Sequence, residues 1–228
     1  MSIKKNYIAG EWQEGTATVK NINPADTSDV IGEYATADAE QTKAAIAAAR
    51  SAFPSWSQGG IQQRSELLDR IGQKILDRKQ ELGELLAREE GKSLPEAIGE
   101  VGRAGQIFKY FSGEVLQLRG EIQPSVRPGL EASVTREALG VIGMITPWNF
   151  PIAIPAWKIA PALAYGNCVV FKPAELVPGS AHALAEIIVE AGVPAGVFNL
   201  VMGPGRLVGE TIVNDKRVDG ISFTGSVN

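Results

Sequence analysis

Four short apolar runs decide the fold of the second half of the chain: VIGMIT (141–146), CVVF (168–171), VFNLV (197–201) and GISF (220–223). Their first residues lie 27, 29 and 23 positions apart, and the stretches between them, 153–164, 181–191 and 206–214, have helical character. Strands and helices that alternate at this interval form β-α-β crossovers, so the sequence predicts an α/β fold with a parallel sheet and helices on both faces. Ligands of such sheets bind beyond the carboxyl ends of the strands, which makes the residues after each run the first candidates for function.

The residues before position 120 have a different pattern. Short apolar pieces separated by turn signals predict an edge ribbon over residues 1–35. Apolar residues at helical spacing then predict three amphipathic helices before any long strand. The first begins at Asp38, which forms a capping box with Gln41, and ends near Phe53, whereas the other two cover 67–86 and 98–115. Residues 121–139, which contain Pro124, Pro128 and Gly129, predict a protruding hairpin.

Composition limits the possible partners and sites. The 228 residues carry a formal charge of −4 and no run of five like charges, which disfavours nucleic acid and anionic membranes as partners. No segment approaches the apolar length of a transmembrane helix, and the first residues lack a signal-peptide pattern, so we expect a cytoplasmic protein. One cysteine, Cys168, and one histidine, His182, leave no disulfide and no plausible metal site.

Polar or glycine-rich turns follow all four runs. Lys172 and Glu175 suit a nucleotide ribose, because an ammonium donates to its hydroxyls and a carboxylate accepts from them. Gly225 and Ser226 could offer backbone N–H groups and a hydroxyl to a pyrophosphate. The segment GPGRLVG (203–209) has one residue too many for the G-x-G-x-x-G fingerprint, which disfavours an ordinary Rossmann dehydrogenase. Each signal alone is weak, and Lys172 and Glu175 could also be a solvated pair on a loop, although their position at a strand end favours the ribose.

The order and spacing of several motifs give a specific resemblance. The motifs TPWNFP (146–151), FKPAE (171–175) and FTGS (223–226), with YIAGEW (7–12) and NPAD (23–26), resemble the aldehyde dehydrogenase superfamily over essentially the whole chain. The resemblance implies a Rossmann-like NAD(P)-binding domain formed by 1–119 and 140–228, with 120–139 as an oligomerisation hairpin of a homodimer or homotetramer. The cofactor would be NAD or NADP, with NAD slightly favoured because Glu175 would repel a 2′-phosphate.

The resemblance also assigns roles to individual residues. Asn149 matches the family asparagine whose amide stabilises the oxyanion, although without the motif it would be interpreted as a turn residue between Pro147 and Pro151. Lys172 and Glu175, with Ala174 between them, match the ribose-binding segment. The wall beside the nicotinamide ribose is matched by Ile145, Thr146, Pro147 and Trp148. The glycines near the adenine are matched by Gly205 and Gly209. The pyrophosphate turn is matched by Phe223, Gly225 and Ser226.

The family's catalytic glutamate, in an E-L-G-G motif, and its nucleophilic cysteine, in G-Q-x-C, both follow F-T-G-S. This chain ends at Asn228, so we expect the catalytic domain to be absent, the helix after Ser226 to be cut short at Val227 and Asn228, and the chain alone to be inactive. The parent enzyme would oxidise an aldehyde to its acid. A non-catalytic nucleotide-binding module is the alternative, and a structural protein on the same scaffold is a third.

The substrate would be a small aldehyde. Arg103 lies among Gly99, Gly102 and Gly105 on a helix that borders the aldehyde entrance in the family, and it could bind a carboxylate bidentately. Residues 89–178 resemble the branch that oxidises 2-oxoglutarate semialdehyde, which carries such a group. An exposed ion pair between Arg103 and Glu100 is the alternative.

The remaining candidates have simpler interpretations. Trp157 could form a wall of the substrate passage, whereas Trp12, Trp56 and Trp148 are expected to pack. Cys168 is expected to be a small buried hydrophobe, and His182 an exposed or capping residue.

Overall fold

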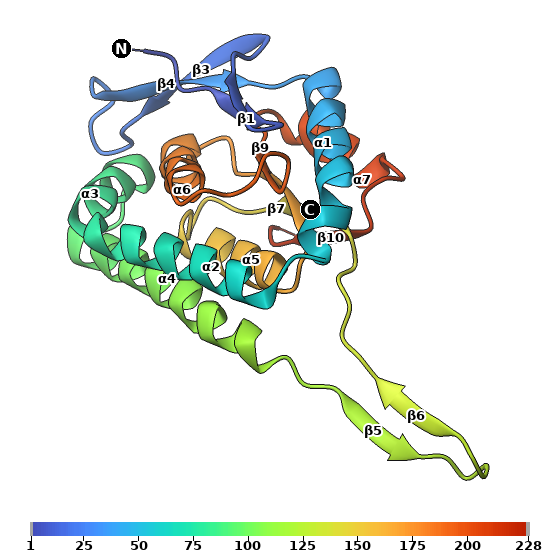
Figure 1. Cartoon of the computed structure of the whole chain (residues 1–228). Helices are drawn as coiled ribbons and strands as arrows, with labels where there is room; N and C mark the ends of the chain where they lie inside the picture. The colour runs from blue at the N-terminus through green and yellow to red at the C-terminus, as the bar shows by residue number, and fades with distance from the viewer. Residues whose placement is uncertain (1, 227–228) are drawn as a thin grey trace.

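The computed structural model describes residues 2–226 and has a six-stranded sheet at its centre, in the order β10-β7-β8-β9-β1-β2 (Figure 1). The strands of the alternating region pair in parallel. Their bounds are β7 (Val141–Ile145), β8 (Cys168–Lys172), β9 (Phe198–Leu200) and β10 (Gly220–Phe223). Each agrees with a predicted run to within one residue at either end, so the predicted parallel sheet is confirmed.

Helices cover both faces of this sheet. On one face, α1 (Ala39–Ser57) packs on β7, β8 and β9, and it also contacts α7 (Glu210–Asn214). On the other face, α5 (Ala153–Ala164) packs on β7 and β8, and α2 (Ile61–Asp77) lies across α5 and α6 (Pro178–Glu190). The antiparallel neighbour of α2 in this outer layer is α4 (Leu94–Glu114) (Figure 1). The predicted α/β class with covered faces is therefore confirmed.

The sequence predicts three helices before residue 120, but residues 2–119 of the structure contain four, α1 to α4. Residues 67–86 belong to two helices, α2 and α3 (Lys79–Glu90), which are separated at Arg78. No glycine or proline marks this break, so the local sequence contains no stop signal. The two helices share α4 and α6 as neighbours but differ in their other contacts, since α2 also packs on α5 whereas α3 also contacts the strand 30–36. Tertiary packing thus divides a segment whose apolar spacing alone is continuous.

The start of α1 confirms half of the predicted capping box. The Asp38 carboxylate accepts a hydrogen bond of 2.8 Å from the backbone N–H of Gln41. The Gln41 side chain does not return to Asp38, because it donates to the carbonyl of Glu14 at 2.7 Å. The helix start is therefore tied to the N-terminal ribbon.

The first part of that ribbon forms the far edge of the sheet, as predicted, whereas the rest of residues 2–35 does not. Strands β1 (Asn6–Ile8) and β2 (Glu11–Gln13) form a hairpin, and β1 pairs antiparallel with β9 through Tyr7 and Leu200. Two buried asparagines reinforce this edge, because the Asn199 Oδ1 accepts from Ala9 N at 3.0 Å and the Asn6 Oδ1 accepts from Met202 N at 2.7 Å. Strands β3 (Ala17–Ile22) and β4 (Val30–Thr36) form a separate two-stranded sheet.

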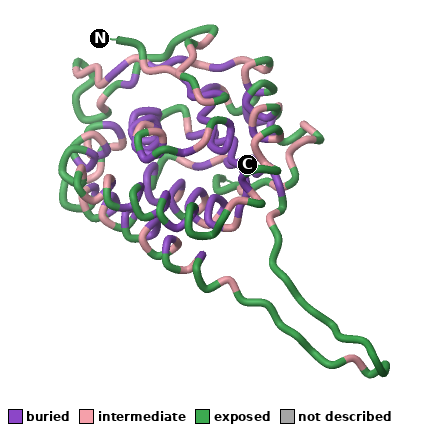
Figure 2. Tube along the Cα trace, in the orientation of Figure 1, coloured by how far each residue is buried: buried purple, intermediate pink, exposed green. Residues whose placement is uncertain are grey.

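The predicted hairpin protrudes from the body of the molecule. It follows η1 (Val115–Gln117), and its strands β5 (Glu121–Pro124) and β6 (Glu131–Val134) pair only with each other. Figure 2 shows this arm as almost entirely exposed, in contrast to the buried centre of the molecule. Its exposed apolar side chains are Ile122, Val126, Leu130 and Val134.

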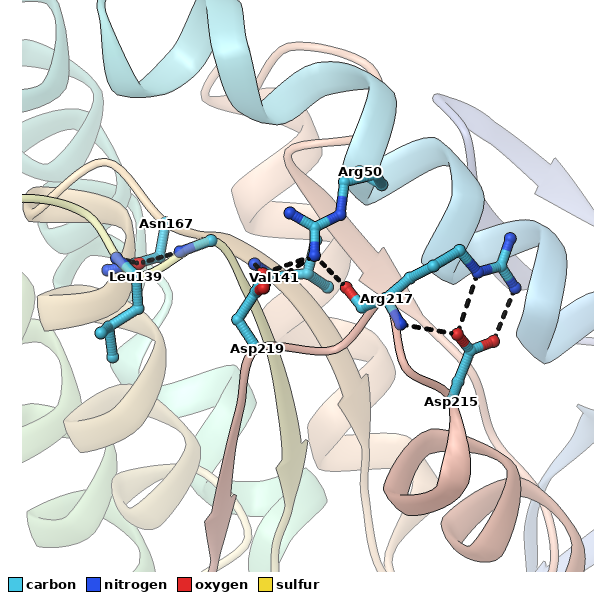
Figure 3. Close-up of polar contacts among 8 residues, drawn as sticks. Arg50, Leu139, Val141, Asn167, Asp215, Arg217 and Asp219 are labelled. Atoms are coloured by element: carbon cyan, nitrogen blue, oxygen red, sulfur yellow. Dashed lines mark hydrogen bonds and ion pairs between the residues drawn. The ribbon is translucent and has the colours of Figure 1, made fainter.

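Three polar side chains, of which Asn167 is buried, fix the return of the arm into β7. Asn167 Oδ1 accepts from the N–H groups of Leu139 and Gly140, and Asp219 accepts from Val141 N at 2.7 Å (Figure 3). Arg50 of α1 donates to the same Asp219 carboxylate at 2.7 Å. Gly140 has a φ of +137°, and an added Cβ would collide with that carboxylate. The arm, the first residue of β7 and the start of β10 are thus joined at one point.

Within residues 2–226, no helix combines the length and apolarity needed to cross a membrane.

Candidate cofactor and substrate site

The strand order places a topological switch point between β7 and β10. The chain proceeds from β7 to β8 and β9 in one direction, and β10 then returns to the opposite side of β7. Backbone bonds continue past the strand ends, from Thr224 N to Ile145 O at 3.1 Å and from Thr146 N to Lys172 O at 3.3 Å. Ligands of open α/β sheets bind beyond such a point, at the carboxyl edge. The predicted turns meet at this edge.

The loop after β7 presents its side chains at the surface. Thr146 is buried and Pro147 half-buried, whereas Asn149 is exposed. The Asn149 amide makes no side-chain hydrogen bond with any described residue, which leaves both its donors available. Trp148 is 51% exposed, so the expectation that it packs is wrong. Its ring lies at the rim because the buried positions of this loop are taken by Thr146 and Pro151.

The last residue of β8 carries a buried ammonium group. Lys172 is 4% exposed, and its Nζ donates to the carbonyl of Pro173 at 2.9 Å. Burial lowers the pKa of Lys172, although the nearby Glu175 carboxylate offsets part of this effect. No carboxylate of residues 2–226 lies within ion-pair distance of Lys172. A buried cation without a counter-ion is costly, so this edge suits a ligand that accepts hydrogen bonds.

Glu175 lies at the surface of the loop after β8. Its Oε1 accepts from Gly205 N at 3.0 Å, which joins the turns after β8 and β9. Ala174 is half-buried between the two polar residues. The two predicted ribose-binding groups therefore lie at the end of β8 and in the loop after it, but they do not pair directly.

Two glycines open the surface beside these groups. They begin and end η2 (Gly205–Gly209), a π-helical turn that leads into α7 and replaces the first residues of the predicted helix 206–214. An added Cβ at Gly205 would meet nothing within 4 Å, and one at Gly209 would lie 3.8 Å from Ile145 Cδ1 and 4.0 Å from Lys172 Cδ. No side chain therefore fills the space beside Lys172 at the buried Gly209, and the backbone is exposed at Gly205 beside Glu175, which leaves room for a nucleotide. The residues present fit a nicotinamide dinucleotide.

The end of β10 completes the edge. Phe223 is 57% exposed, and its ring occupies the space that a Cβ on Gly225 would need. Ser226, the residue after Gly225, is exposed. The helix expected to follow, at Val227 and Asn228, lies outside the described residues.

A separate pocket of about 300 Å³ brings together the two predicted substrate residues. Arg103 and Trp157 line it with Gln106, Ile107, Tyr110 and Phe111, from α4 and α5. Arg103 is exposed and forms no ion pair with residues 2–226. The alternative of an Arg103–Glu100 pair is wrong, because Glu100 is buried and binds Lys92 at 2.7 Å.

One buried carboxylate near the site was missed by sequence reasoning. Glu89, at the end of α3, is 3% exposed and accepts from Ser180 N at 2.7 Å, from Gly179 N and from the Asn21 amide. It therefore caps the first turn of α6, which follows the Lys172–Glu175 loop. Burial raises the pKa of Glu89 to about 7, even though these hydrogen bonds act in the opposite direction.

A family model described as the aldehyde dehydrogenase family matches residues 12–228. The chain belongs to the aldehyde dehydrogenase family. This agrees with the resemblance drawn from the motifs at 146–151, 171–175 and 223–226.

Curated relatives within the aldehyde dehydrogenase family include semialdehyde enzymes. The chain is 44% identical to the alpha-ketoglutarate semialdehyde dehydrogenase of Haloferax volcanii and 41% identical to the alpha-ketoglutaric semialdehyde dehydrogenase of Bacillus subtilis. Each match covers 97% of this chain and 46% of the relative. The chain thus spans about half the length of the curated relatives it matches.

Solved aldehyde dehydrogenases have the same fold. An NAD-dependent aldehyde dehydrogenase from Sinorhizobium meliloti matches with a TM-score of 0.95 and 35% identity, over 99% of this chain and 46% of that one. A betaine aldehyde dehydrogenase from Staphylococcus aureus, solved in complex with NAD+, matches with a TM-score of 0.92 and 36% identity, over 96% of this chain and 44% of that one.

Cys168 and His182 are the remaining candidate residues of this aldehyde dehydrogenase chain. Cys168 is buried at the start of β8, and burial raises the pKa of its thiol to about 12, which agrees with a structural role. His182 is buried rather than exposed, with its ring 4.7 Å from that of Trp12 and 6.1 Å from that of Tyr34. Within residues 2–226, no cluster of three potential metal ligands occurs.

Proposed function

We propose that this chain forms the cofactor-binding half of an NAD-dependent aldehyde dehydrogenase that oxidises a semialdehyde bearing a carboxylate, such as 2-oxoglutarate semialdehyde. The observation that carries the proposal is the convergence of Asn149, Lys172, Glu175 and Gly209 at the switch-point edge of the sheet. This activity requires the rest of the family fold as well. We use "the longer protein" for a polypeptide that contains this chain and that remainder.

The proposed cofactor contacts follow from the rim described above. Lys172 and Glu175 bind the hydroxyls of the adenosine ribose, and Gly205 and Gly209 leave room near the adenine. Backbone at Ile145, Thr146, Pro147 and Trp148 forms a wall beside the nicotinamide ribose, while the turn of Phe223, Gly225 and Ser226 receives the pyrophosphate. When bound, the nicotinamide supplies the hydride acceptor. The Asn149 amide donates to the aldehyde oxygen as negative charge develops on it.

Glu175 provides a test of the cofactor site. Replacing Glu175 with alanine should weaken NAD binding to the longer protein by about 10-fold, because a hydrogen bond to a charged group contributes about 1.5–3 kcal/mol and the residue is exposed. Calorimetry measures this change, with Glu66→Ala, an exposed glutamate of α2, as the control. Equal affinity in the two variants would place the ribose elsewhere.

The same carboxylate should disfavour NADP through repulsion of the 2′-phosphate. NAD is therefore the proposed cofactor, and Glu175→Gln should narrow the difference in affinity between NAD and NADP. An unchanged ratio of the affinities for NAD and NADP would show that Glu175 does not cause the preference for NAD.

Arg103 supports a carboxylate-bearing substrate. It is an unpaired guanidinium in a pocket with Trp157, and the relatives from Haloferax volcanii and Bacillus subtilis are named as semialdehyde dehydrogenases. In the longer protein, Arg103→Met should raise the KM for 2-oxoglutarate semialdehyde by about 10-fold or more, since a bidentate charged pair is lost. The KM for an uncharged aldehyde of similar length should stay nearly constant.

Steady-state kinetics with both aldehydes measures this. A parallel rise in both KM values would show that Arg103 acts through the shape of the pocket. A longer protein that binds NAD but oxidises no aldehyde would favour the non-catalytic nucleotide-binding module instead.

The arm at 120–139 is proposed to serve contact between subunits in a homodimer or homotetramer, with 1–119 and 140–228 as the cofactor-binding domain. Its strands expose Ile122 and Val134 and pair with no other part of the described chain. Exposed apolar surface of this kind marks an interface. Deleting 120–139 from the longer protein should yield monomers in light scattering, and oligomers of unchanged mass would contradict the assignment.

A further inference from the structure

A buried ion network lies beneath the loop that carries Asn149. Lys92, between α3 and α4, has a side chain only 13% exposed, and its Nζ lies 2.7 Å from Glu100 Oε2 and 3.6 Å from Glu90 Oε2. The same Nζ donates to the backbone carbonyl of Asn149 at 2.9 Å and lies 4.3 Å from the centre of the Phe150 ring. One ammonium group thus holds the first half of the loop.

Glu100 holds the second half. Its side chain is 2% exposed, and its Oε1 accepts from Ile152 N at 3.0 Å and from Ala153 N at 3.1 Å. These N–H groups begin α5, where Ile152 is the N-cap residue and provides no side-chain cap of its own. A carboxylate at this position satisfies donors that the helix leaves unpaired and interacts favourably with its dipole. Glu100 is therefore a helix cap supplied by α4.

The network therefore fixes both ends of the turn from Asn149 to Ala153. The Asn149 side chain makes no hydrogen bond with residues 2–226, so only its backbone determines where the amide lies. We propose that Lys92 and Glu100 are positioning residues that hold the Asn149 amide in place for the reacting oxygen. This inference rests on the proposed function of Asn149, and it adds two residues that touch neither substrate nor cofactor.

The alternative is that the network only stabilises the fold, and kinetics can separate the two roles. Lys92→Met in the longer protein should lower kcat by about 10- to 100-fold, because a displacement of about 1 Å at a catalytic group has effects of this size. The KM for NAD should change by less than about 2-fold, since Lys172 and Glu175 lie at the end of β8 and in the loop after it. Lys92→Arg should retain most of the activity, because a guanidinium can still donate to Glu100 and to the Asn149 carbonyl.

A double-mutant cycle then tests whether Lys92 acts through Asn149. In an Asn149→Ala background, Lys92→Met should lower kcat by less than about 3-fold, because the group that it positions is already absent. The control is Lys109→Met, which removes an ammonium group of α4 that pairs with Asp69 of α2 at 2.8 Å. Losses in kcat that multiply in the double variant would overturn the positioning role.

Hydrogen exchange gives a readout independent of activity. In the 228-residue chain, Glu100→Leu, which removes the acceptor, and Lys92→Met should raise exchange at the amides of Ile152 and Ala153 by about 10-fold or more, whereas Lys109→Met should not. Unchanged protection in both variants would overturn the inference even if the longer protein oxidises aldehydes. If the longer protein oxidises no aldehyde, the proposed function is wrong. The hydrogen-exchange rates at Ile152 and Ala153 would still show whether the network fixes this loop.

Discussion

Replacing Asn149 with alanine is expected to lower the kcat of the longer protein by about 100- to 1000-fold, the usual cost of removing one donor from an oxyanion site. The amide is exposed at the switch-point edge and has no hydrogen-bond partner among the described residues. Its donors are therefore free to meet negative charge that develops on the aldehyde oxygen. Because this charge is small in the ground state, the loss should fall on kcat rather than on the KM for NAD.

Single-turnover and steady-state kinetics measure this effect. Asn214→Ala, which removes an exposed amide at the end of α7, is the matched control and should leave kcat unchanged. Turnover that survives Asn149→Ala would show that the residue is only a turn former between Pro147 and Pro151. Loss of turnover in Cys168→Ser, with folding intact, would contradict the structural role of that cysteine.

The stability of the chain should fall between about pH 5 and about pH 8 because of Glu89. Burial raises the pKa of this carboxyl from 4.5 to about 7, so the folded state binds more protons than the unfolded state within that window. The contribution is fully present below the unfolded pKa and is lost as pH rises through the folded pKa. Its upper limit is about 3 kcal/mol, at 1.36 kcal/mol for each pKa unit.

Glu89→Gln should remove this dependence, because the amide is neutral throughout and its oxygen can still accept from Ser180 N. Urea unfolding of the 228-residue chain at about pH 5.5 and about pH 8 measures the change. Glu84→Gln, an exposed glutamate of the same helix, is the control. A wild-type chain that is equally stable at both values, or a Glu89→Gln variant that keeps the wild-type slope, would contradict the assignment.

The sequence predicts the cofactor half of the site well because its signals are local. The apolar runs at 141–146 and 168–171 form strands, and the turns after them carry Asn149, Lys172 and Glu175 to one edge of the sheet. Parallel strands have a common polarity, so the spacing of the runs already implies this convergence.

Groups that act over long sequence separations were not predicted. Glu100 caps α5 and Glu89 caps α6, and neither contact has a local signature. A signal did exist, since Glu89 follows Leu86 and Glu100 follows Ala97 by three residues, which places each acid on the apolar stripe of its helix. His182 was misjudged for a similar reason, because Trp12 and Tyr34, which bury it, come from the distant N-terminal ribbon.

The pairing of β1 with β9 has a consequence for the order in which the molecule is made. Tyr7 is synthesised well before its partner Leu200, because the two residues are separated by most of the sequence that forms this sheet. Until then the β1–β2 hairpin has an unpaired edge, and the Asn6 side chain lacks the Met202 backbone that it accepts from. Closing so long a loop is entropically costly and slow, so this edge of the sheet can form only after Leu200 and Met202 have been synthesised.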